Sequence, residues 1–192
     1  MMKTLCLPLI AAAVCVAAQA GEISGKVAAG KGISVVYVDA VPGKTFPAPA
    51  KPLQMDQKSL LFQPHILVVP VGVTVEFLNS DKVQHNIFWP AIGNNKKLGH
   101  NLGTWPTGQK RAFKFETPGI VPLLCNVHPE MSGYVIVTPT PFYAETGAAG
   151  SFKISNVPDG SYTLTAWHEG FKTQSKPVTV AGAATVDFML SK

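Results

Sequence analysis

Apolar and polar residues alternate along the chain, and no stretch after residue 20 shows a sustained helical repeat. The alternation is clearest in four segments, at 73–79, 112–116, 162–167 and 185–190. A period of two places every second side chain on the same face of a strand, so each segment is typical of a half-buried β-strand. Because 17 glycines and 16 prolines are available for turns between short strands, the sequence predicts an all-β protein, built as a sandwich or a barrel.

The first twenty residues differ in character from the rest of the chain. They contain one lysine near the start, then a short apolar run, and they end in the small-residue pattern Ala18-Gln19-Ala20. This arrangement is typical of a secretory signal peptide cleaved before Gly21, and the apolar run is short for the alternative, a membrane anchor. We therefore expect residues 1–20 to be removed and the mature protein to be periplasmic or secreted, without a membrane span.

Cys125 is the single cysteine outside the predicted signal peptide, which contains Cys6 and Cys15. A lone cysteine in an oxidising compartment cannot form a disulfide within its own chain. Its thiol is therefore either buried and inert or engaged in chemistry, and its neighbours decide between the two.

Cys125 begins the segment CNVHPEM, in which three metal-binding side chains have the spacing C-x2-H-x2-M. Thiolate, imidazole and thioether together suit copper that cycles between Cu(I) and Cu(II), whereas zinc usually takes carboxylate or further thiolate in place of a thioether. Pro129 biases His128 toward an extended backbone and stiffens the loop. A second imidazole is available from His85, which follows a predicted strand and its turn. The sequence therefore predicts one copper ion bound by His85, Cys125, His128 and Met131.

Residues 55–138 resemble the cupredoxins, the type 1 blue copper proteins that include amicyanin and plastocyanin. The resemblance is carried by FQPHILVVPVGVTVEFLNSDKVQHN and by FETPGIVPLLCNVHPEM, whose short ligand loop and His-Pro pair are similar to those of amicyanin. It implies a Greek-key β-sandwich that holds one type 1 copper ion. The implied ligands are three strong equatorial donors and one weak axial donor, in the order His85, Cys125, His128 and Met131.

The end of the chain resembles a second family. The segment GSFKISNVPDGSYTLTAWHEGF is similar to the carboxypeptidase regulatory-like β-sandwich, and the opening pattern of that fold lies here at 21–39. Residues 139–192 alone are too few for a robust core. We therefore expect a signal peptide at 1–20, a copper-binding domain at 52–138, and a small second β-sandwich at 139–192 that residues 21–41 complete.

The remaining polar residues with metal-binding or tuning potential receive simpler interpretations. His65, His100 and His168 are expected to be ordinary surface or strand histidines, and Glu130 a solvated charge at the rim of the site. The resemblance implies that Asn86, which follows the first histidine ligand, forms a hydrogen bond near the ligand loop and tunes the thiolate.

Three functions are compatible with a copper-binding chain. Four protein ligands leave no open position for a substrate, which favours a one-electron carrier over an enzyme. A storage or delivery protein would more often show clusters of methionine or histidine, and an oxidase or reductase would need histidines for a second copper. No Ser-His-Asp set or poised carboxylate pair is evident. The sequence therefore predicts an exported, non-enzymatic protein that shuttles single electrons between periplasmic redox partners, with copper storage or delivery as the alternative.

The surface charge bears on the partner. Removal of residues 1–20 would lower the formal net charge from +5 to +4, because that segment carries one lysine and no acid. No aromatic platform typical of nucleic-acid binding accompanies the basic residues. We expect these residues to orient an acidic redox partner. They are Lys96, Lys97, Lys110, Arg111 and Lys114.

Electrons are expected to leave through the exposed edge of His128. Val127, Pro129 and Met131 surround it on the loop, and the apolar segment 87–92, which contains Trp89, follows His85 directly in the chain. The sequence predicts an apolar docking patch from these residues, with the alternative that Trp89 belongs to the core.

Overall fold

The computed structural model describes residues 20–147 and 149–192. Within these ranges the chain forms strands β1–β17 and one 3₁₀ helix, η1 (Lys96–Leu98), and no α-helix, which confirms the predicted all-β fold. No helix in the described part is long and apolar enough to cross a membrane. The predicted signal peptide, residues 1–20, lies outside the described residues except for Ala20.

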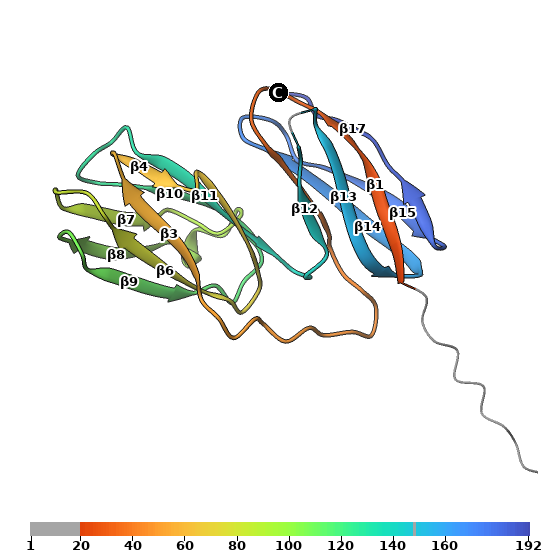
Figure 1. Cartoon of the computed structure of the whole chain (residues 1–192), viewed down its shortest axis with the longest axis horizontal. Coiled ribbons are helices and arrows are strands. Elements are labelled where there is room, and N and C mark those ends of the chain that lie inside the picture. Colours follow the sequence, from red (N-terminus) through yellow and green to blue (C-terminus); the bar gives the residue numbers. More distant parts are fainter. Residues whose placement is uncertain (1–19, 148) are drawn as a thin grey trace, which may run out of the picture.

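The middle of the chain folds into a β-sandwich of two sheets, the first sandwich (Figure 1). One sheet has the strand order β5-β11-β10-β7-β8, with bounds Ile66–Pro70, Ser132–Thr138, Gly119–Leu124, His85–Trp89 and His100–Trp105. The other has the order β4-β3-β6-β9, with bounds Leu61–Gln63, Leu53–Lys58, Thr74–Asn79 and Lys110–Lys114.

The alternation in β6 explains how the two sheets pack. Val75 and Phe77 are buried in the core, whereas Glu76 between them pairs with Lys110 at the surface. Burial of one face in this way is what a period of two predicts. The core between the sheets extends to the loop between β10 and β11, because Met131 belongs to the same buried cluster.

Strands from both ends of the described chain form the second sandwich (Figure 1). One of its sheets has the order β13-β1-β16, with β17 also paired to β1; the bounds are Ser151–Pro158, Ala20–Ala28, Ala183–Thr185 and Phe188–Met189. The other has the order β12-β2-β14-β15, with bounds Tyr143–Glu145, Ser34–Val38, Gly160–His168 and Gln174–Val180. The small second β-sandwich predicted in the fold class is therefore confirmed.

The segment 185–190 was expected to be one strand, and this expectation is wrong. The chain pairs with β1 in two short pieces, β16 and β17. Between them β1 approaches so closely that a Cβ on Gly25 would lie 1.9 Å from the carbonyl oxygen of Val186. The side chain of Asp187 accepts the next backbone N–H, from Lys26 at 2.7 Å, and replaces a ladder bond.

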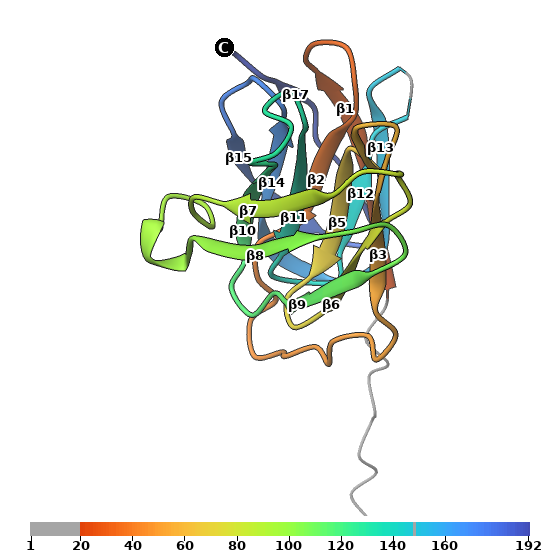
Figure 2. The same cartoon turned by 90° about the vertical axis from the view of Figure 1, so that its left-hand side faces the viewer.

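The two sandwiches meet along an apolar seam, and Figure 2 views the molecule with the first sandwich in front. Ile66, Val68 and Ile136 on β5 and β11 pack against Val35 of β2 and Trp167 of β14. Because β11 turns its alternate residues into the core of the first sandwich, it is buried on both faces.

Candidate metal centre

Two neighbouring strands bring the predicted ligands together. His85 is the first residue of β7, and the segment from Cys125 to Met131 connects β10 to β11. β7 pairs with β10 through Phe88 and Leu124, so the start of β7 lies beside this loop. One loop therefore contains three of the candidate ligands, and the start of an adjacent strand contains the fourth.

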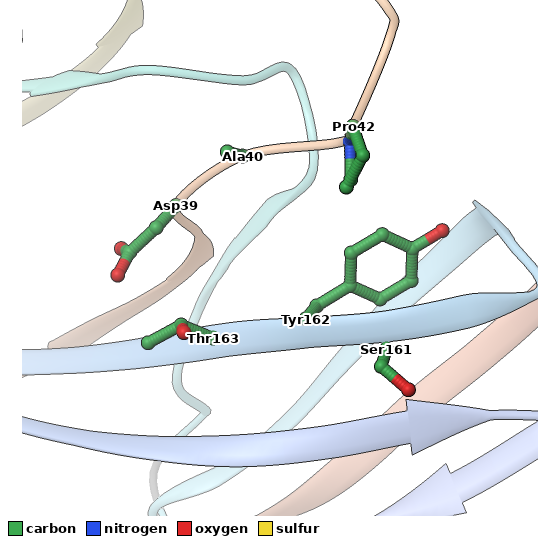
Figure 3. Close-up of a pocket in the computed structure, with 6 residues that line it drawn as sticks. All are labelled: Asp39, Ala40, Pro42, Ser161, Tyr162 and Thr163. Carbon is green, nitrogen blue, oxygen red and sulfur yellow. The ribbon is translucent and has the colours of Figure 1, made fainter.

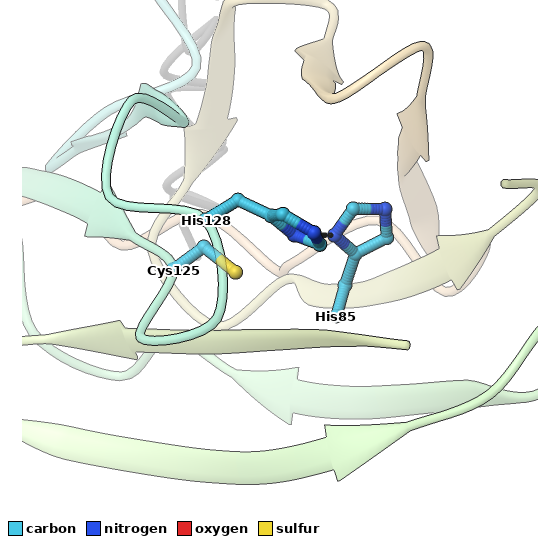
Figure 4. Close-up of side chains that lie close together, drawn as sticks. All are labelled: His85, Cys125 and His128. Carbon is cyan, nitrogen blue, oxygen red and sulfur yellow. Dashed lines mark hydrogen bonds between the residues drawn. The ribbon is translucent and has the colours of Figure 1, made fainter. Parts of the chain in front are cut away.

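His85, Cys125 and His128 form a compact cluster at this end of the first sandwich (Figure 4). One ligand atom from each lies within 4.8 Å of the others, and the two Nδ1 atoms are 3.1 Å apart. His85 is fully buried and Cys125 is 3% exposed, whereas His128 is partly exposed. The cluster therefore has two buried members and one imidazole that reaches the surface.

The donor set and its geometry fit copper. Two imidazole nitrogens and a thiol converge in one place, which is the equatorial set of a type 1 site. When both rings are neutral, one of the facing Nδ1 atoms accepts a hydrogen bond from the other. A cation bound between the rings would instead be coordinated by the lone pairs of both Nδ1 atoms. The fit is therefore to a single ion in this cluster.

Met131 lies at the end of the same loop. It is fully buried in the cluster of apolar side chains that contains Cys125, and its backbone N–H donates to the carbonyl of His128 at 3.0 Å. The structure thus places Met131 beside the trio, and its role as the weak axial ligand stays a prediction.

The ring of His85 is fixed from outside the cluster by Asp81. The Nε2 atom of His85 lies 2.9 Å from Oδ2 of Asp81. An ionised carboxylate can only accept, so His85 carries its proton on Nε2 and its Nδ1 lone pair is free for a metal. Burial alone would raise the pKa of Asp81, but hydrogen bonds from Leu60, His85 and Ser59 outweigh it and hold the pKa below its usual value.

Asn79 orders the loop between β6 and β7. Its Nδ2 donates to the carbonyls of Val83 and Trp105, at 2.9 and 3.0 Å, and its Oδ1 accepts from the backbone of Asp81 at 3.0 Å. Neither Asp81 nor Asn79 was among the site residues predicted from the sequence. An acid four residues before a candidate histidine ligand was the available signal.

Asn86 makes the predicted hydrogen bonds to the ligand loop. Its backbone N–H donates to Sγ of Cys125 at 3.4 Å, and its Oδ1 accepts from the backbone of Asn126 at 3.3 Å. Its Nδ2 donates to Oδ1 of Asn101 and to the carbonyl of Gly103, both at 2.8 Å. Contact with the sulfur thus comes from the backbone, and the side chain holds the loop.

The other histidines lie outside the cluster. His65 is exposed and bonds Glu169 of the second sandwich at 2.7 Å, and His100 is an exposed ring against Trp89. His168 is buried; its Nδ1 donates to the carbonyl of Glu169 at 2.8 Å, and its Nε2 has no partner among the described residues. The expectation that Glu130 is an exposed charge is confirmed.

The predicted apolar patch is wrong in two members. Trp89 is 1% exposed and donates from Nε1 to the carbonyl of Leu98, and Met131 is fully buried. Val127 is 45% exposed, as expected. The other large exposed apolar side chains of the first sandwich are Val83 in the loop before His85, Leu60 in the turn whose backbone bonds Asp81, and Leu61 at the start of β4.

A hollow of about 330 Å³ lies on the second sandwich (Figure 3). Its lining residues are Asp39, Ala40, Pro42, Ser161, Tyr162 and Thr163. The hydroxyl of Tyr162 donates to the carbonyl of Pro158 at 2.7 Å, and Oδ2 of Asp39 accepts from Thr165 at 3.0 Å. Both polar groups are therefore already engaged in holding the fold.

Comparison with known families agrees with the geometry. Residues 50–138 match the model of copper binding proteins of the plastocyanin/azurin family, and residues 132–191 match the carboxypeptidase regulatory-like domain. Residues 50–138 form a cupredoxin domain. Copper is the cofactor of this family, and the cluster of His85, Cys125 and His128 is consistent with one type 1 copper ion.

Several solved structures are similar to the cupredoxin domain. A reduced amicyanin variant is 24% identical and covers 46% of this chain and 84% of that chain, with a TM-score of 0.42. A purple cupredoxin from Nitrosopumilus maritimus is 28% identical, covering 45% and 99%, with a TM-score of 0.40. A copper-containing nitrite reductase from Thermus scotoductus SA-01 is 25% identical, covering 52% and 25%, with a TM-score of 0.43. No curated protein sequence matches the chain.

Proposed function

We propose that this protein is an exported one-electron carrier that exchanges electrons with redox proteins of the periplasm. One copper ion would be held by His85, Cys125 and His128, with Met131 as the weak axial donor. The observation that carries the proposal is the convergence of two imidazoles and a thiol within 4.8 Å at the end of a cupredoxin domain.

The chain prepares this site before any metal binds. Asp81 fixes the tautomer of His85, and Asn86 donates to the sulfur of Cys125. Copper supplies the Cu(I)/Cu(II) couple, and a set of ligands held by the fold changes little between the two states. Small reorganisation favours rapid electron exchange, whereas a storage or delivery protein needs ligands that release their ion. We therefore prefer the carrier over the alternative of copper storage or delivery.

His128 is the proposed exit for electrons, because it is the partly exposed member of the cluster. Val127 beside it is 45% exposed, and Leu61 and Val83 are 54% and 45% exposed. We propose that these side chains together form an apolar surface near His128, which would allow a partner to approach closely and leave quickly. The exposed lysines Lys96 and Lys97 would orient an acidic partner at longer range, an effect that salt weakens.

The proposed division of the chain follows the strand pairing. Residues 1–20 are proposed as a signal peptide and 52–138 as the electron-carrying domain. The segment 139–192 is proposed to form a second domain with residues 21–41, since β1 pairs with β13 and β2 pairs with β14.

The deciding experiment is a visible spectrum after addition of Cu(II) to the metal-free protein. We expect an intense blue or green colour that reduction bleaches, one copper per chain, and no such colour in Cys125→Ser, whose fold should persist. Electron self-exchange, measured by NMR line broadening in mixtures of reduced and oxidised protein, should be fast compared with transfer of copper to a chelator. A colourless copper-loaded protein would refute the site. Slow self-exchange with rapid copper release would favour storage or delivery.

A further inference from the structure

The hairpin turn between β3 and β4 has an unusual backbone. Lys58 pairs with Leu61, so Ser59 and Leu60 are the two central residues, and both have φ of 58°. A two-residue turn with positive φ at both positions normally contains asparagine, aspartate or glycine. Leucine is unsuited to this conformation, so the surroundings must hold the turn.

The side chain that holds the turn is Asp81. Its Oδ1 accepts the backbone N–H of Ser59 at 2.6 Å, and its Oδ2 accepts that of Leu60 at 2.9 Å. The same Oδ2 lies 2.9 Å from Nε2 of His85. One carboxylate oxygen therefore joins the turn to a proposed copper ligand.

The strand order explains why these three groups meet. β3 and β6 are parallel neighbours, with Gln57 opposite Asn79. The turn after β3 and the loop after β6 therefore leave the sheet side by side, and Ser80 donates from its backbone to the carbonyl of Gln57 at 3.1 Å. Asp81 reaches the turn from this loop.

We propose that the Ser59–Leu60 turn is an outer support of the metal centre, which positions His85 through Asp81. The two turn amides fix the position of the Asp81 carboxylate. This carboxylate in turn fixes the ring plane of His85 and which of its nitrogens is protonated. In this arrangement Asp81 and the two turn amides are positioning groups that act on the metal only through His85. The expected effect on copper binding rests on the proposed function. The effect on the orientation and the protonated nitrogen of His85 can be measured in the metal-free protein.

The test compares two substitutions at one position. Leu60→Pro removes the N–H and excludes positive φ. The matched control Leu60→Asn keeps the N–H, tolerates positive φ and removes little packing, since Leu60 is 40% exposed. Asp81→Ala serves as the reference for complete loss of the support.

The primary measurement is ¹⁵N NMR of histidine side chains in the metal-free protein. We expect a slowly exchanging Nε2–H on His85 in the wild type and in Leu60→Asn, and its loss in Leu60→Pro and Asp81→Ala. In the copper-loaded protein, the last two should bind copper about tenfold more weakly, measured by competition with a chelator. Leu60→Asn should bind copper as the wild type does.

An unchanged His85 Nε2–H signal in folded Leu60→Pro would overturn the proposal. Should Leu60→Pro fail to fold, the α-hydroxy analogue of leucine at position 60 replaces the N–H by oxygen and keeps the side chain. It should weaken the His85 signal in the same direction, and an unchanged signal there is equally decisive. A colourless wild type with the expected NMR result would refute the proposed function and leave the support intact.

Discussion

Replacement of Asn86 by alanine separates the two roles that the structure gives this residue. The substitution removes three side-chain hydrogen bonds, to Asn101, Gly103 and Asn126, and leaves the backbone N–H that donates to Cys125. A typical hydrogen bond contributes about 0.5–1.5 kcal/mol. Because these bonds are only partly buried, we expect Asn86→Ala to lower the free energy of unfolding by about 2–3 kcal/mol.

Urea unfolding of the metal-free protein measures this loss, and the visible spectrum after copper addition tests the site. The copper colour should persist, since the hydrogen bond to the sulfur comes from the backbone. Asn95→Ala is the matched control, because its side chain accepts one bond, from the backbone of Lys97 at 3.0 Å. We expect that variant to lose at most about 1 kcal/mol. If Asn86→Ala is as stable as the wild type, or if it loses the copper colour, then the side chain does not act mainly on stability and the backbone N–H does not act alone on the sulfur.

Three further results are expected. Met131→Leu should keep the colour and raise the reduction potential in voltammetry, because a thioether donor favours Cu(II); an unchanged potential would exclude Met131 as a ligand. Burial and then Asp39 raise the pKa of Tyr37 from 10.0 to about 12, so the folded state favours the neutral phenol and loses stability as pH rises through this range. Between pH 10 and about 12, Tyr37→Phe should lose less of its free energy of unfolding, measured with urea, than the wild type does. Equal losses of stability in the two proteins would contradict this. Val127→Asp should slow electron self-exchange without changing the colour, whereas Met189→Asp, on the second sandwich and 78% exposed in the wild type, should exchange like the wild type. Equal rates in the two variants would place the exit elsewhere.

The sequence predicts strands well where one face of the strand is buried and the other faces solvent. In β6 the buried Val75 and Phe77 flank the surface residue Glu76, and the alternation is visible without a structure. In segment 185–190 the same pattern is misleading. There the chain is divided by contact with Gly25, which lies about 160 residues earlier, and a local period carries no information about such a partner.

The candidate ligands were predictable because their chemistry is concentrated in one short segment. The surface around them was not. Trp89 is close to His85 in sequence, but on β7 it lies on the same face as Ile87, which turns into the core of the first sandwich, so its indole ring is buried there. The Ser59–Leu60 turn also lies close to His85, through Asp81, and it is brought there by the parallel pairing of β3 with β6, which a local sequence pattern does not reveal.

The role of Asp81 could not be predicted from the sequence either. An acid four residues before a histidine is visible in the sequence, yet the role of its carboxylate depends on two amides of a distant turn. Those amides are available because Ser59 and Leu60 adopt positive φ, which their residue types do not predict. A hydrogen-bond partner that depends on an unfavoured backbone conformation can be found only in the folded chain.

The two sandwiches are joined through the strand that leaves the metal centre. β11 begins directly after Met131, turns Val135 and Val137 into the first core, and packs Ile136 into the seam. Tyr134 on the same strand lies 5.0 Å from the ring of Trp167 on β14. A strand buried on both faces cannot shift without breaking one of the two cores. The second sandwich therefore stiffens one end of the ligand loop, while Asp81 and Asn86 hold the buried ligands at the other side. His128, which is the exposed member, is left as the part of the cluster that a partner can reach.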